Sequence, residues 1–134
     1  MAETIELEIV TPENLVVKDW AEEVQIPGRK GYLGILPGHA PLITELAIGE
    51  IVYSKAGVAT RLSVAWGFAE VLPDKVTILA ETAELAEDID LPRAEAARDR
   101  AVEHLKKAED AAAYEEASTA LSRAEARIAV AKSK

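Results

Sequence analysis

Apolar and polar residues alternate along much of the first 90 positions of the chain. Ile5, Leu7 and Ile9 alternate with Glu6 and Glu8, and this period of two is typical of a strand with one buried face. Many short strands at close spacing predict an antiparallel β-sandwich or flattened barrel. The further apolar runs lie at 24–26, 50–55, 60–64, 68–72 and 76–80, and turn residues at 11–14, 27–28, 56–57, 65–67 and 73–74 separate the runs.

The spacing of apolar residues changes to three and four after residue 90. Asp90 is predicted to be the N-cap of a helix, with Pro92 in the first turn, where a missing N–H is tolerated. The apolar stripe breaks around Glu109-Asp110-Ala111 and then resumes, which predicts an antiparallel helical hairpin. The first stripe consists of Ala94, Ala97, Ala101, Leu105 and Ala108, and the second of Ala113, Ala117, Ala120, Leu121, Ala124, Ile128 and Ala131.

Alanine dominates the predicted seam between these two helices. Such a seam lets helices approach closely, but it buries little of the apolar area that stabilises a fold by about 25 cal/mol per Å². We therefore expect the hairpin to be the less stable half, able to detach or reorient while the sandwich stays folded.

Composition and charge change at the same place as the periodicity. The first 90 residues hold all seven Gly and five of the six Pro, with 16 acidic and 6 basic side chains and a net charge of −10. Residues 91–134 hold 14 Ala, with 8 acidic and 9 basic side chains and a net charge of +1. The chain is therefore predicted to contain a β-sandwich domain, residues 1–88, and a C-terminal two-helix domain, residues 89–134.

Several classes of protein are disfavoured by these features. The overall charge of −9 would repel the phosphates of nucleic acid, and the absence of Cys excludes disulfides and thiolate metal sites. No apolar run approaches the 18 residues of a membrane span, and the N-terminus lacks the basic start of a signal peptide. These features favour a cytosolic protein with no transmembrane segment of its own.

The sequence contains no recognisable catalytic constellation. His39 and His104 are the only histidines, they lie far apart in the sequence, and no phosphate-binding loop, nucleophile elbow or HExxH motif is present. Most carboxylates alternate outward along strands, where a solvated surface is the simplest interpretation. An enzyme therefore has little support, and no metal site or cofactor is expected.

The densest cluster of turn residues lies at 31–44. Three Gly and two Pro within its first eleven positions predict an irregular path, because Gly permits positive φ and Pro fixes φ. One interpretation is a tight corner between two strands. The other is a rigid, partly apolar loop that docks on a partner.

The motif Gly34-Ile35-Leu36-Pro37-Gly38-His39-Ala40-Pro41-Leu42 resembles the signature loop of the epsilon subunit of bacterial F-type ATP synthases. The resemblance extends over the whole chain and implies a β-sandwich followed by a helical hairpin. It also implies a non-catalytic rotor subunit of the central stalk, bound to the gamma subunit and to the ring of c subunits at the cytoplasmic face of the bacterial plasma membrane. By the same resemblance, Arg29, Lys30, Tyr32 and His39 lie towards the c ring.

The segment Ile89-Asp90-Leu91-Pro92-Arg93-Ala94 is similar to the proposed ATP-binding pattern of that family. The resemblance makes ATP a regulatory ligand, and the sequence does not fix whether Mg²⁺ takes part. A simpler interpretation is that Asp90 only caps the helix and that the arginines only pair with nearby acids. The contacts implied by the resemblance are Glu84, Ile89, Asp90, Arg93, Ala94, Arg123 and Arg127.

The resemblance finally implies a switch with two states. With ATP bound, the hairpin folds against the sandwich. Without ATP, it extends along gamma into the alpha/beta catalytic head and inhibits ATP hydrolysis. A weak alanine seam suits such a switch, because the two states must differ by only a few kcal/mol. The alternative is a purely structural stalk adaptor whose helices do not sense ATP.

Overall fold

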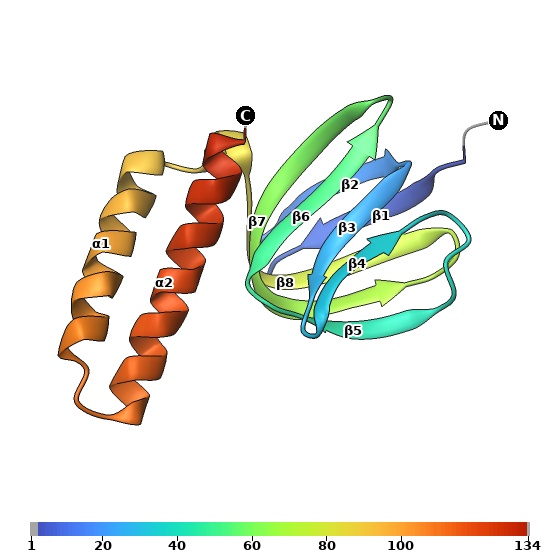
Figure 1. The fold of residues 1–134 in the computed structure, drawn as a ribbon. Coiled ribbons are helices and arrows are strands. Elements are labelled where there is room, and N and C mark those ends of the chain that lie inside the picture. Colours follow the sequence, from blue (N-terminus) through green and yellow to red (C-terminus); the bar gives the residue numbers. More distant parts are fainter. Residues whose placement is uncertain (1–2, 134) are drawn as a thin grey trace.

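The predicted strands form one continuous sheet that folds over an apolar core (Figure 1). Within residues 3–133, which the computed structural model describes, the sheet has eight strands in the order β2-β1-β8-β7-β5-β3-β4, and β6 pairs with β3 and β7. Two helices follow and lie side by side, beside the sandwich. The strands are β1 (Ile5–Val10), β2 (Leu15–Ala21), β3 (Glu23–Gly28), β4 (Gly31–Ile35), β5 (Leu42–Leu46), β6 (Gly49–Lys55), β7 (Val58–Val71) and β8 (Lys75–Leu85).

The alternation in the first strand is confirmed. Ile5, Leu7 and Ile9 are fully buried, whereas the intervening glutamates are only partly covered. Lys75 Nζ lies 3.3 Å from Glu6 Oε2 and 3.2 Å from Glu8 Oε1. The period of two therefore directs the apolar side chains into the core and leaves the acids where β8 supplies a counter-ion.

The predicted turn at 65–67 is wrong, because β7 continues through it. The strand bends at Trp66, with φ of 48°, and at Gly67, with φ of 140°. β6 pairs with β7 before the bend and β5 pairs with it after the bend, while β8 accompanies both halves. Because its hydrogen-bonded pairing with β8 continues through the bend, β7 exchanges β6 for β5 on its other edge without ending.

The irregular segment is shorter than the sequence predicts. Within 31–44, strand β4 and the start of β5 have regular partners in β3 and β7, and only residues 36–41 follow an irregular path. Strand β2 is absent from the sequence prediction. It pairs with β1 and buries Val17 and Ala21, but its polar residues and the exposed Trp20 obscure the alternation.

The helical hairpin is confirmed, with α1 at Leu91–Lys107 and α2 at Ala111–Lys132 after a short 3₁₀ turn, η1, at Ala86–Asp88. Asp90 accepts a hydrogen bond from the backbone N–H of Arg93 at 3.2 Å, as the predicted N-cap should. Asp110 caps α2 in the same way, with 2.7 Å to the N–H of Ala113. Helix α2 lies between α1 and the sandwich (Figure 1) and contacts β6 and β7.

The seam between the helices is built from small residues, among them the buried Ala94, Ala101, Ala117 and Ala124. Ala113 and Ala120 were also expected on the seam but are exposed. They line a surface groove between the helices, because the two helices meet only along part of the predicted stripe. Val130, which the stripe did not include, is fully buried and packs at the junction between the two parts of the chain.

Candidate ligand site between the sandwich and the hairpin

A pocket of about 210 Å³ lies where α2 meets β7 and β8. Arg123 and Arg127 reach it from α2, since their spacing of four places them on one face of the helix. Glu81 and Glu84 reach it from β8. Both domains therefore contribute charged side chains to one cavity.

Arg127 makes the closest contact across this interface. Its Nε and Nη2 atoms lie 2.6 and 2.5 Å from Oε1 of Glu84. The two side chains remain 38% and 30% exposed, so solvent screens the pair and its contribution to stability is small. The pair nevertheless joins α2 to β8.

Arg123 has a different environment. Its guanidinium carbon lies 4.5 Å from the ring centroid of Trp66, and its Nη2 lies 4.0 Å from Oε1 of Glu81, at the limit of an ion pair. The Nε atom is buried and has no hydrogen-bond partner among the described residues. Arg123 thus stacks on an aromatic face while one donor remains unsatisfied.

The first turn of α1 contributes less to this pocket than the sequence pattern implied. Asp90 and Arg93 are exposed and are not among the lining residues. Ile89 is only 6% exposed and packs against α2, and Ala94 is 2% exposed at the helix seam. The structure therefore brings Glu84, Arg123 and Arg127 together and leaves the other predicted contacts outside the cavity.

The charges of the pocket balance in this conformation, because two arginines face two glutamates. A phosphate group would take up the same guanidinium donors through charge-assisted hydrogen bonds. Such a ligand therefore competes with Glu84 for Arg127, whereas at Arg123 it meets a guanidinium whose Nη2 lies 4.0 Å from Glu81, at the limit of an ion pair.

Two of the three predicted docking residues around the β3–β4 turn are held by local contacts. Arg29 Nη1 lies 2.5 Å from Oε2 of Glu45, and Lys30 is exposed. The Tyr32 hydroxyl accepts a hydrogen bond from the N–H of Glu50 at 3.2 Å, although the side chain is 58% exposed. Tyr32 is therefore fixed in position with most of its ring on the surface.

His39 lies apart from that turn, in the connection between β4 and β5. Its Nδ1 atom is 2.7 Å from the carbonyl oxygen of Ala40. A surface hollow between β3, β4 and β5 is lined by Arg29, Lys30 and Tyr32, whereas His39 does not line it.

Sequence analysis missed an exposed apolar row on the sandwich, formed by Val10, Leu15, Phe68 and Leu79. These residues are cross-strand partners in register, so they lie in one row over β2, β1, β8 and β7. Phe68, Leu79 and Leu15 are each more than half exposed. Val10, Phe68 and Leu79 are apolar at strand positions where the alternation calls for polar residues, and this is the signal that could have revealed the row.

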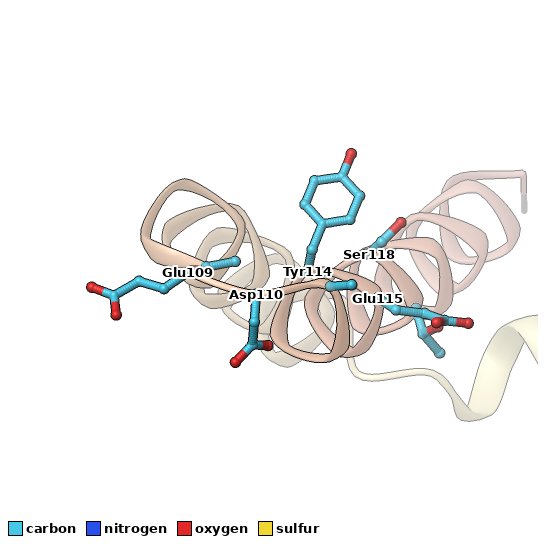
Figure 2. Close-up of a pocket in the computed structure, with 8 residues that line it drawn as sticks. Glu109, Asp110, Tyr114, Glu115 and Ser118 are labelled. Carbon is cyan, nitrogen blue, oxygen red and sulfur yellow. The ribbon is translucent and has the colours of Figure 1, made fainter.

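A larger, open hollow of about 790 Å³ lies at the turn between α1 and α2 (Figure 2). Its lining includes Glu109, Asp110, Glu115 and the exposed Tyr114, whose side chains point in different directions. No basic side chain from the described part of the chain lines it, so it does not suit a phosphate ligand. The smaller pocket at the interface is therefore the better candidate site.

The described residues contain no group of three or more His, Cys, Asp or Glu that is arranged to hold a metal ion. Within the same part of the chain, neither helix combines the length and apolarity that crossing a membrane requires.

Comparisons with known proteins identify the family of this chain. Residues 4–86 match the family described as the beta-sandwich domain of the ATP synthase delta/epsilon chain, and residues 87–132 match its long alpha-helix domain. The chain belongs to the ATP synthase epsilon chain family. An epsilon chain from Koribacter versatilis is 67% identical over 106 residues, which are 79% of this chain and 75% of that relative. An epsilon chain from Solibacter usitatus is 46% identical over 134 residues, the full length of both.

Solved structures confirm the epsilon-chain fold. A chain in the Euglena gracilis mitochondrial ATP synthase superposes with a TM-score of 0.83 at 23% identity, covering 94% of this chain and 80% of that one. A chain in the central stalk and c ring of the Tetrahymena thermophila enzyme gives 0.68 at 11% identity, covering 96% and 97%. The β-sandwich with a C-terminal helical hairpin, expected from the sequence, is thus the fold of this family.

Proposed function

We propose that this epsilon chain couples the gamma subunit to the c ring in the central stalk and that its hairpin responds to ATP. One observation carries the second part: the pocket with Arg123 and Arg127 is shared by sandwich and hairpin. A ligand that contacts both domains binds the docked hairpin more tightly than the detached one, and only such a difference shifts the equilibrium. The domain of residues 1–88 would dock, and residues 89–134 would regulate.

The exposed apolar row supports the docking part of the proposal. Phe68 and Leu79 are 53% and 55% exposed, and large exposed apolar groups in one row are typical of a protein interface. Arg29 and Lys30, on an otherwise acidic sandwich, suit an acidic loop of the c ring. The similar Tetrahymena chain belongs to a structure of a central stalk and c ring, in line with a place in the rotor.

Without ATP, the hairpin would leave the sandwich, extend along gamma into the alpha/beta head and inhibit ATP hydrolysis. Its arginines would then exchange the glutamates of β8 for acidic segments of the head. The role is regulatory rather than catalytic, with the subunit bound peripherally at the cytoplasmic face of the plasma membrane.

A purely structural adaptor is the second candidate, and one observation favours it. Arg127 pairs with Glu84, and Arg123 lies over Trp66, so contacts within the protein give both arginines partners on the sandwich. In that case the two arginines only hold the hairpin against the sandwich, and ATP does not change their partners.

Calorimetric titration of the full chain with ATP separates the two candidates. We expect heat of binding that Arg127→Ala reduces, with ATP also slowing amide exchange in α1 and α2 because the docked hairpin is stabilised. Arg98→Ala is the matched control, since Arg98 pairs with Asp99 within α1. If no heat of binding is detected at millimolar ATP, the ATP response is refuted and the structural adaptor is the remaining candidate.

The same titration tests Asp90. Asp90→Ala and Asp110→Ala each remove an N-cap, so each costs about 1 kcal/mol of helix stability. If Asp90 also contacts ATP, its substitution weakens binding more than the Asp110 substitution does. Equal effects would restrict Asp90 to capping.

A further inference from the structure

Trp66 has a backbone conformation that a bulky residue rarely adopts. Its φ of 48° is in the left-handed region, where a side chain with a large Cβ substituent is strained. The residue lies within β7, beside Gly67, at the bend where that strand changes partner. Backbone strain at a single position of a well-paired strand suggests that the side chain at that position has a function.

The indole of Trp66 supplies the contact that distinguishes Arg123 from the other arginines. The guanidinium lies over the ring at 4.5 Å. The ladder places Trp66 between the pairs Ala65–Thr82 and Gly67–Ala80, so Glu81 is its neighbour on β8. The indole of Trp66 and the carboxylate of Glu81 therefore form a binding surface on the sandwich for Arg123 of α2.

Stacking and hydrogen bonding use different parts of a guanidinium. The ring covers one flat face, whereas the five N–H groups point outward in the plane and remain free to donate. The Nε donor of Arg123 is buried, but 43% of the side chain is exposed, and Arg123 lines the pocket together with Arg127. Because its Nη2 lies 4.0 Å from Glu81, at the limit of an ion pair, the stacked Arg123 keeps terminal N–H groups for a ligand in the pocket.

We propose that Trp66 is a positioning residue of the interface pocket: its indole holds Arg123 flat so that the guanidinium edge receives a phosphate group of the ligand. This inference rests on the proposed ATP response and adds to it a residue of the sandwich. The strain at φ of 48° is the cost of placing an aromatic ring at this bend.

Trp66→Gly separates positioning from a structural role, because it relieves the strained φ while removing the ring. We expect the full-length variant to unfold no more easily than the wild type, yet to bind ATP roughly twofold to fivefold more weakly, the size of a partly exposed cation–π contact. Trp66→Phe keeps an aromatic face and should recover most of the affinity. Arg123→Lys should bind as weakly as Trp66→Gly, since an ammonium does not combine stacking with a planar fork.

Trp20→Phe is the matched control, because Trp20 is exposed on β2 and does not line the pocket. Inorganic triphosphate serves as a second probe that lacks the nucleoside. Unchanged affinity of Trp66→Gly for a probe that the wild type binds would overturn the inference while leaving the ATP response intact. A wild type that binds triphosphate but not ATP would refute the ATP response alone. Binding of neither probe would refute both.

Discussion

Gly67 lies where the backbone of β8 leaves no room for a side chain on β7. A Cβ at this position would lie 1.9 Å from the carbonyl oxygen of Leu79 and 2.9 Å from the Cα of Ala80. Both neighbours are backbone atoms of a paired strand, so neither can rotate away, and φ of 140° strains any side chain.

We expect Gly67→Ala to lower the free energy of unfolding by about 3 kcal/mol or more, through backbone strain and a displaced ladder. Gly34→Ala is the matched control, since Gly34 lies in β4 with open space where the new methyl group would project, and it should change stability by less than about 0.5 kcal/mol. Urea unfolding measures both variants. Equal effects would contradict the close approach.

At the scale of elements, Asp19 connects β2 to β6. Lys55 Nζ donates to its Oδ1 at 2.7 Å, the N–H of Trp20 donates to the same atom at 2.8 Å, and the Tyr53 hydroxyl lies 3.4 Å from Oδ2. The hydrogen bond from Lys55, with further donation from the Trp20 N–H, lowers the pKa of Asp19 below its usual 3.8.

The lowered pKa of Asp19 in the folded state determines how the stability of the protein changes with pH. The ionised carboxylate stabilises the fold above pH 3.8, the value in the unfolded chain, and this contribution disappears as the pH falls through the lower folded pKa. We expect Asp19→Asn to be less stable than the wild type at neutral pH, with the difference shrinking in acid. Denaturant unfolding across that range measures it, and a difference independent of pH would contradict the assignment.

The whole molecule is a rigid sandwich joined to a smaller hairpin by a few polar contacts and a small apolar cluster. The cluster consists of Ile89, Val130 and Ala131, with partly buried neighbours. The core of the sandwich is much larger. This asymmetry suits the proposed roles, in which the sandwich docks and the hairpin moves.

The proposed docking through the apolar row depends on the whole sandwich, because four of its strands contribute to the row. We expect the double variant Phe68→Ser, Leu79→Ser to bind gamma at least about tenfold more weakly, because interface anchors of this kind contribute most of the binding energy. Its folding should change little, since both side chains are more than half exposed. Copurification with gamma measures the effect, and Val58→Ser, 65% exposed but outside the row, is the control.

Local patterns in the sequence were enough to predict the alternation of β1, the hairpin and the N-cap Asp90. Each depends on neighbours within a few positions, and so does the family motif at 34–42. The resemblance also selected Arg123, Arg127 and Glu84, which the structure brings into one pocket.

Tertiary structure decided the features that join distant segments. The bend of β7 at Trp66 depends on β8, which pairs with β7 on both sides of the bend. The position of Arg123 depends on its contact with Trp66, 57 positions earlier in the chain. Val130 is buried only because α2 ends against the junction of the domains. The sequence by itself determined both helices and most of the strands, because these follow from local spacing, and its family motif led to three of the four charged residues of the pocket. Which partners those charges have, and which apolar side chains remain exposed, follows only from the packing of strands and helices that are remote in sequence.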